Sequence, residues 1–295
     1  MSDGPRIVAL GGGHGLAVTL RSVLPWAGSV TAVVSTADDG GSTGRLRESW
    51  DVPALGDVRR CLATLAEVSD PSGVWSRVLE RRFDAGELSG HALGNLVLLA
   101  LIEEVGDLQS ACDEVARATA IPRDRARVVP VTDDAVVLHG RTVDGVVVAG
   151  QVAVARTEGI QEVWVDPAST AASSVAIEAI GKADLVVLGP GSLYTSVLAA
   201  AVVGDLRRAL ADTSARVAYV GNLRADGAEA RDYDLAAHLA ALARHGIQPD
   251  VALAATGSLP LGELGLSVVE ADVARADGMA HDPARLGAAL ATLVP

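Results

Sequence analysis

RIVALGGGHG, residues 6–15, is the stretch on which the fold depends: an apolar run with two β-branched residues, followed at once by clustered glycines. Residues 6–10 predict a buried strand, and residues 16–24 predict a helix that Pro25 ends. Glycines between a strand and a helix let backbone N–H groups approach a phosphate, and the helix adds the positive end of its dipole. We therefore predict a phosphate loop at Gly12, Gly13, His14 and Gly15, although a tight structural turn would use the same glycines.

The loop departs from the dinucleotide fingerprint G-x-G-x-x-G. Starting that pattern at Gly11 puts Leu16 at the third glycine, and starting it at Gly13 puts Val18 there. The missing glycine weakens the case for an NAD-dependent oxidoreductase, since that residue allows close packing of helix on strand. Phosphate binding needs only the backbone N–H groups, so that prediction is unaffected.

Beyond this unit, short β-branched runs alternate with amphipathic helical stretches. The sequence predicts further strands at 30–35, 185–188, 216–220 and 250–254, and helices at 58–68, 92–105, 108–120, 168–180 and 235–245. Such alternation is typical of an α/β fold with a mainly parallel sheet covered on both faces. Residues 128–165 instead show Val-rich runs and an Asp144-Gly145 turn with no helical period, which indicates an antiparallel β excursion. We expect a single domain spanning 1–295.

Composition restricts the classes of function. The chain has 295 residues and a formal net charge of −13, so we expect no nucleic-acid binding, which requires a positive field. Cys61 and Cys112 lack metal-ligand spacing and predict buried free thiols. Neither a signal peptide nor a membrane span is recognisable, so we expect a cytoplasmic protein.

The second candidate loop, TADDGGSTGRLR at 36–47, follows the second predicted strand. Adjacent carboxylates suit Mg²⁺, while glycine, hydroxyl and guanidinium groups suit a phosphate. We predict ligand binding by Asp38, Asp39, Ser42, Arg45 and Arg47, with Mg²⁺ at Asp38 and Asp39. The alternative is a solvated turn.

Three further segments contain polar residues at the starts of predicted helices. Asp57 either N-caps the helix that follows or reaches a ligand. His91 and Asn95 are four residues apart and share one helix face, where they either approach a ligand or support the structure. The glycine-rich stretch at 189–196 follows a buried strand and predicts a backbone nest for an anion at Gly189, Gly191 and Ser192. Pro190 occupies the position of the first glycine of a G-x-S-x-G nucleophile elbow, so hydrolase chemistry has little support.

As an ordered set, these motifs resemble the YvcK branch of the CofD-like family over essentially the whole chain. The matching stretches are GGGHG (11–15), ADDGGSTGRLR (37–47), PALGDVRRCL (53–62), GHALGNL (90–96), DLVVLGPGSLYTSV (184–197) and YVGNL (219–223). The resemblance implies a Rossmann-like three-layer fold and a nucleoside-diphosphate ligand, namely a UDP-sugar such as UDP-N-acetylglucosamine. It implies ligand roles for Asn222 and Tyr233, and a regulatory function in cell shape and envelope synthesis during gluconeogenic growth. The resemblance is also compatible with protein partners in envelope regulation and with a homodimer.

The resemblance also keeps an enzyme alternative open. Members of the CofD branch transfer 2-phospholactate to a deazaflavin precursor, using Mg²⁺ held by an aspartate at the position of Asp38 or Asp39. The form Asp-Asp-Gly-Gly-Ser-Thr-Gly-Arg resembles the YvcK branch instead. Residues 224–232 depart from the Thr-Gln-Pro-Gly-Glu-Thr stretch common in that branch, which leaves sugar specificity open.

Overall fold

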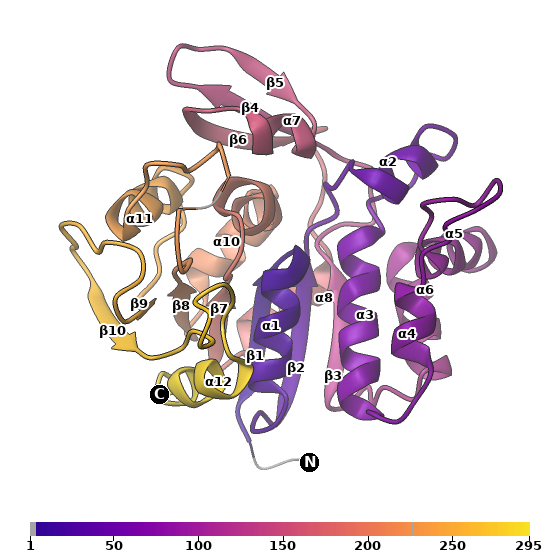
Figure 1. The fold of residues 1–295 in the computed structure, drawn as a ribbon, viewed down its shortest axis with the longest axis horizontal. Coiled ribbons are helices and arrows are strands. Elements are labelled where there is room, and N and C mark those ends of the chain that lie inside the picture. Colours follow the sequence, from indigo (N-terminus) through magenta and orange to yellow (C-terminus); the bar gives the residue numbers. More distant parts are fainter. Residues whose placement is uncertain (1–3, 226) are drawn as a thin grey trace.

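The computed structural model describes residues 4–225 and 227–295 and contains a seven-stranded parallel sheet in the order β10-β9-β8-β7-β1-β2-β3. Both faces of this sheet are covered by helices (Figure 1). The predicted α/β three-layer fold is confirmed. The strands are β1 (Arg6–Gly11), β2 (Ser29–Val34), β3 (Ala126–Pro130), β7 (Leu185–Leu188), β8 (Arg216–Val220), β9 (Val251–Ala255) and β10 (Ser267–Ala271).

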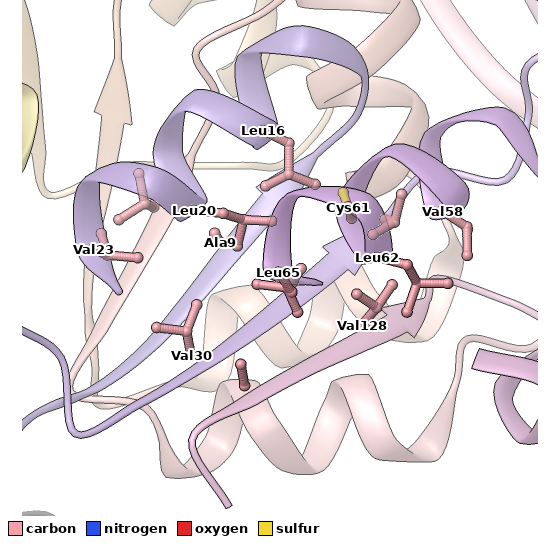
Figure 2. Packing of buried hydrophobic residues seen from close by; sticks show 14 of the residues in the cluster. Ala9, Leu16, Leu20, Val23, Val30, Val58, Cys61, Leu62, Leu65 and Val128 are labelled. Carbon is pink, nitrogen blue, oxygen red and sulfur yellow. The ribbon is translucent and has the colours of Figure 1, made fainter. Parts of the chain in front are cut away.

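One face of the sheet is covered by helices that mostly follow β1 and β2. Leu16, Leu20 and Val23 pack on the strands beside Cys61, Leu62 and Leu65 (Figure 2). Both cysteines are free and buried, as predicted. The helices on this side are α1 (Gly13–Val23), α3 (Gly56–Ser69), α4 (Trp75–Glu80), α5 (Leu93–Val105), α6 (Leu108–Ala118) and α12 (Pro283–Ala291).

The opposite face packs against the segments that follow β6, β7 and β8. Their apolar side chains form a second cluster around Val8, Leu10 and Val33, which point away from the first cluster because side chains alternate along a strand. These segments are α8 (Ser174–Lys182), the π-helix η1 (Leu193–Leu198), α9 (Ala199–Ala201), α10 (Gly204–Asp212) and α11 (Leu235–Arg244). No helix among the described residues is long and apolar enough to span a bilayer.

The predicted antiparallel excursion is present but is smaller than 128–165. β4 (Val137–Thr142), β5 (Val147–Ala149) and β6 (Ile160–Asp166) form a three-stranded antiparallel sheet, and residues 143–146 form the predicted hairpin turn. Two parts of the prediction are wrong. Residues 128–130 belong to β3 of the parallel sheet, and the excursion contains a helix, α7 (Gln151–Arg156). The small sheet lies near α2 (Gly41–Arg47) at the top of Figure 1.

Candidate nucleotide site at the strand ends

The strand order reverses between β1 and β7, where the two predicted phosphate loops meet. In open α/β sheets ligands bind in the crevice beyond the carboxyl ends of the strands at this reversal. The loops are in direct contact: a Cβ placed on Gly15 would lie 1.9 Å from the Pro190 carbonyl oxygen, and the Thr19 hydroxyl donates to the Gly189 carbonyl at 2.8 Å. Glycine at position 15 is therefore required by the approach of the second loop.

A cavity of about 290 Å³ opens beside these loops. Five of the predicted ligand residues line it: Gly13, Asp38, Ser42, Asp57 and Asn95. Sequence reasoning did not propose the other lining residues, which are Gly40, Gly41, Thr43, Gly56, Arg59, Arg60, Arg82, Gln151 and Ser196. A larger hollow, about 710 Å³, lies near the starts of β8 and β9, and none of the predicted site residues lines it.

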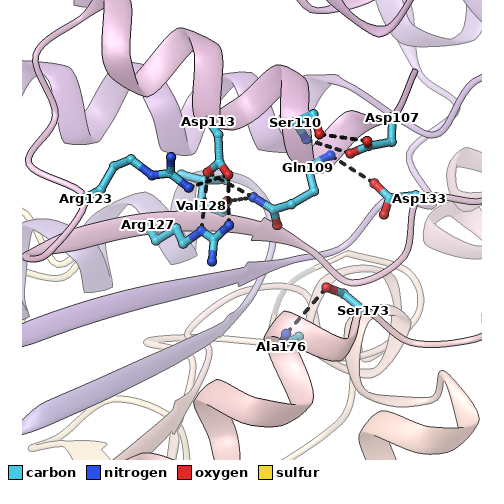
Figure 3. Close-up of polar contacts among 10 residues, drawn as sticks. All are labelled: Asp107, Gln109, Ser110, Asp113, Arg123, Arg127, Val128, Asp133, Ser173 and Ala176. Atoms are coloured by element: carbon cyan, nitrogen blue, oxygen red, sulfur yellow. Dashed lines mark hydrogen bonds and ion pairs between the residues drawn. The ribbon is translucent and has the colours of Figure 1, made fainter. Parts of the chain in front are cut away.

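Three helices of eight residues or more begin at this cavity without a side-chain cap. α1, α3 and α5 contribute Gly13, Asp57 and Asn95 respectively, and their N-cap residues make no side-chain cap hydrogen bond. Two of the first N–H groups are nonetheless bound within the protein, that of Gly13 by the Asp57 carboxylate and that of Leu93 by the Arg81 carbonyl. By contrast, α6, α8, α11 and α12 are capped by Asp107, Ser173, Asp234 and Asp282. Figure 3 shows the first two of these caps. α10, far from the cavity, also lacks one. Helix starts that converge on a cavity favour an anionic ligand there, because each brings the positive end of a helix dipole.

Two carboxylates face the same cavity. Asp38 accepts hydrogen bonds from the Gly40 N–H, at 3.0 Å, and from the Thr43 hydroxyl, yet burial raises the pKa of its carboxyl. Asp57 pairs with Arg60 at 3.2 Å, and burial, followed by the charge of Asp38, raises its pKa to about 6. The raised pKa values indicate that positive charge within the cavity does not fully compensate the two carboxylates.

Asp39 points elsewhere. Its Oδ1 accepts a hydrogen bond from the Val152 N–H at 2.9 Å, at the start of α7, and a Cβ on Gly150 would lie 2.3 Å from its Oδ2. Asp39 therefore ties the loop after β2 to the small sheet. The carboxylate that shares the cavity with Asp38 is Asp57, and a metal role for Asp39 stays a prediction.

The arginines at the cavity differ from the two singled out in the sequence. The Arg47 guanidinium donates to the carbonyls of Asp38, at 3.3 Å, and Val136, at 2.7 Å, while Arg45 donates to the Ser89 carbonyl at 2.9 Å. Arg59, Arg60 and Arg82 line the cavity instead. The signal for two of them was the Asp-Val-Arg-Arg run, which places both arginines in the first turns of α3 beside Asp57.

Buried hydrogen bonds connect Asn95, Ser42 and His91 beside the cavity. The Ser42 Oγ lies 3.1 Å from His91 Nδ1 and 3.2 Å from Asn95 Nδ2, and it also accepts from the Ala92 N–H at 3.4 Å. Burial, followed by the charge of Arg45, lowers the pKa of His91. His91 thus reaches the cavity only through Ser42, whereas Asn95 lines it directly.

The remaining predicted residues lie around the site. Gly12 and Gly191 face each other across the loop contact, next to Ser192. His14 lines an adjoining hollow of about 330 Å³ that shares Arg60 with the cavity, and the charge of Arg60 lowers the pKa of His14. Asn222 accepts a hydrogen bond from the Gly191 N–H at 3.1 Å, so it supports the β7 loop. The Tyr233 hydroxyl lies 3.0 Å from that of Tyr194 and donates to the Ile160 carbonyl at 3.2 Å, away from the cavity.

Known sequences and structures resemble this chain over most of its length. The profile of a family described as 2-phospho-L-lactate transferase CofD matches residues 7–284. The chain belongs to the CofD family. Among members of the family, the gluconeogenesis factor of Halalkalibacterium halodurans is 38% identical over 251 residues, covering 83% of this chain and 76% of that protein. The gluconeogenesis factor of Bacillus subtilis is 36% identical over 247 residues, covering 83% and 76%.

Two further comparisons extend the CofD-family match to nearly the full chain. A Mycobacterium tuberculosis homologue is 40% identical over 313 residues, 98% of this chain and 90% of that protein. The crystal structure of a UPF0052-family protein from Bacillus halodurans superposes with a TM-score of 0.91 at 31% identity, covering 98% of this chain and 99% of the other. The antiparallel excursion and the C-terminal helix thus lie within the shared fold.

Proposed function

We propose that this CofD-family protein binds a nucleoside-diphosphate sugar of the UDP-N-acetylglucosamine type at the cavity by the β1 and β7 loops. The observation on which the proposal depends is the convergence of three helix starts and three arginines on one cavity at the strand-order reversal. A diphosphate presents acceptor oxygens and negative charge, which match backbone N–H groups and guanidinium donors.

A divalent cation fits the same cavity. Asp38 and Asp57 both line it, and the pKa of each carboxyl is raised by burial, so a cation between them would relieve an unfavourable pair of buried charges. Among the described residues no three His, Cys, Asp or Glu side chains gather into a metal cluster. A Mg²⁺ ion would therefore take further oxygens from the ligand's phosphates, as it commonly does.

We further propose a regulatory role in cell shape and envelope synthesis during gluconeogenic growth. The support is that several relatives are named gluconeogenesis factor. A deletion strain is expected to grow poorly on gluconeogenic carbon sources and to be rescued by the wild-type gene, whereas a gene encoding Arg82→Gln should fail. Full rescue by that variant, if it has lost ligand binding, would separate the cellular role from the cavity.

Calorimetric titration with UDP-N-acetylglucosamine, with and without Mg²⁺, tests the binding proposal. Arg82 lines the cavity, and Arg208 is an exposed arginine on α10 that serves as its matched control. Loss of a charge-assisted hydrogen bond predicts at least about tenfold weaker binding for Arg82→Gln, with Arg208→Gln unchanged. Wild-type protein that binds no UDP-sugar under either condition would refute the proposal.

A second candidate function is a Mg²⁺-dependent 2-phospholactate transferase acting on a deazaflavin precursor. It is favoured by the matching family profile and by the Asp38–Asp57 pair in the cavity. Positioning and charge neutralisation support such a transfer without a protein nucleophile. Incubation with a guanylyl phospholactate donor, a deazaflavin acceptor and Mg²⁺ should then give product. No product from protein that still binds UDP-sugar would favour the regulatory function.

A further inference from the structure

Asn95 contains an unpaired polar atom at the wall of the cavity. The residue is 2% exposed, its Nδ2 donates to Ser42 and Thr43, and its Oδ1 has no hydrogen-bond partner among the described residues. A buried acceptor without a partner is unfavourable, because it has lost its hydrogen bonds to water without replacement. Because Asn95 lines the cavity, a ligand group is the natural partner for this oxygen.

The neighbouring hydroxyl groups determine which end of the Asn95 amide faces the cavity. Thr43 has a single hydroxyl proton, which it donates to the Asp38 carboxylate. The group that faces the Thr43 oxygen, 3.5 Å away, must therefore be a donor, which is the Asn95 NH₂. Its carbonyl oxygen is consequently the end directed at the ligand.

The hydrogen bonds of Ser42 and His91 are consistent with this orientation. The Ser42 oxygen accepts from the Ala92 N–H and from Asn95 Nδ2, so its own proton is free for His91 Nδ1 at 3.1 Å. Burial lowers the pKa of His91, and in the neutral tautomer with its proton on Nε2 the Nδ1 atom accepts from Ser42. The hydrogen bonds thus run in one direction: Asn95 donates to Ser42, and Ser42 donates to His91.

We propose that Asn95 Oδ1 accepts a hydrogen bond from a hydroxyl or N–H on the part of the ligand beyond its phosphates. Ser42 and His91 are positioning residues that orient the Asn95 amide. The inference rests on the proposed nucleotide-sugar binding. An ionised phosphate oxygen has only lone pairs to offer and would face another acceptor at this position. Asn95 therefore makes the site selective for nucleotide sugars over phosphate and pyrophosphate. Arg82 and the helix starts contact only the phosphates, so they do not discriminate among these ligands.

The test compares the affinities of UDP-N-acetylglucosamine, UDP and inorganic pyrophosphate, the last by competition. Asn95→Leu, which keeps the volume and removes the acceptor, should weaken UDP-N-acetylglucosamine about tenfold or more and leave pyrophosphate within twofold. If UDP weakens too, the donor belongs to the nucleoside; if UDP is unaffected, it belongs to the sugar. Arg82→Gln is the control with the opposite pattern, since it should weaken all three.

Positioning by His91 has its own test. His91→Asn places an amide oxygen near Nδ1 and should keep the sugar-nucleotide affinity, whereas His91→Phe removes the acceptor and should reproduce the selective loss. Equal weakening of pyrophosphate by Asn95→Leu, or no change for any ligand, would overturn the role of Asn95. Equal affinities of the two His91 variants would overturn the positioning role. Wild-type protein that binds none of the three ligands would instead refute the proposed function, and this inference with it.

Discussion

Substitution of Gly15 by alanine tests whether contact between the β1 and β7 loops builds the site. The added Cβ would lie 1.9 Å from the Pro190 carbonyl oxygen, whereas real Cβ contacts are essentially never below 3.0 Å. The loops must therefore separate by at least about 1.1 Å. That movement acts directly on the hydrogen bond between the Thr19 hydroxyl and the Gly189 carbonyl, now 2.8 Å long.

Two effects of different size follow from this separation. Overpacking of a tight contact costs about 1–3 kcal/mol, which for a chain of this size lowers the melting temperature by roughly 5 °C. A displacement of about 1 Å moves the groups that bind the ligand out of hydrogen-bonding distance, so affinity should fall about tenfold or more. Differential scanning calorimetry and titration with UDP-N-acetylglucosamine measure the two effects separately.

Gly181→Ala is the matched control. Its Cβ would meet no atom within 4 Å, and Gly181 lies in α8 on the far side of the sheet, so stability should be unchanged or slightly higher and binding unaffected. Retention of both wild-type affinity and melting temperature by Gly15→Ala would refute the steric argument. A loss of stability with unchanged affinity would show that the loop contact is structural and takes no part in binding.

Three further substitutions test the electrostatics and the periphery of the site. The folded-state pKa of Asp57, about 6 against a usual 3.8, means that folding stability falls as pH rises between these values. Asp57→Asn should therefore stabilise the protein at pH 7.5 by up to about 3 kcal/mol in urea unfolding, yet lose Mg²⁺-enhanced ligand binding. Burial lowers the pKa of His281 to about 4, so folding stability is lost as pH falls from about 6.5 towards 4. His281→Gln should therefore lose less melting temperature than the wild type over this pH range, and an equal loss would contradict the explanation. Tyr233→Phe should cost about 1 kcal/mol through its lost hydrogen bonds and leave affinity unchanged, and weakened binding would restore its predicted ligand role.

Much of the fold was predictable because its strands are short apolar runs buried on both faces. β7 and β9 are buried at every position and were recognised without difficulty. α7 was missed because its formation depends on tertiary structure: the six-residue helix begins where Asp39, 113 residues earlier, accepts the Val152 N–H. β10 is a half-exposed edge strand of five residues with no fully buried position, so its pattern resembles that of a loop.

The candidate site was predictable at the level of its loops but not of its side chains. The glycine loops and the polar helix starts were found because each follows a strand or begins a helix. That Asp38 shares the cavity with Asp57, and not with Asp39, was not predictable from the sequence. Neighbouring residues in an extended chain point in opposite directions, and Asp39 points towards α7. The sequence also does not distinguish an arginine that binds a ligand from one that, like Arg47, donates hydrogen bonds to two backbone carbonyls.

An anion site in a chain with a net charge of −13 requires a local explanation. Charges in water are screened over about 8 Å at physiological ionic strength, so the distant carboxylates contribute little inside the cavity. There the ligand would meet Arg59, Arg60 and Arg82 together with the starts of α1, α3 and α5. Asp38 and Asp57 line the same cavity and are the carboxylates that a divalent cation would neutralise, while Glu80 pairs with Arg59. Net charge thus opposes long-range attraction of the ligand, while affinity depends on fixed dipoles and paired charges within a few ångströms.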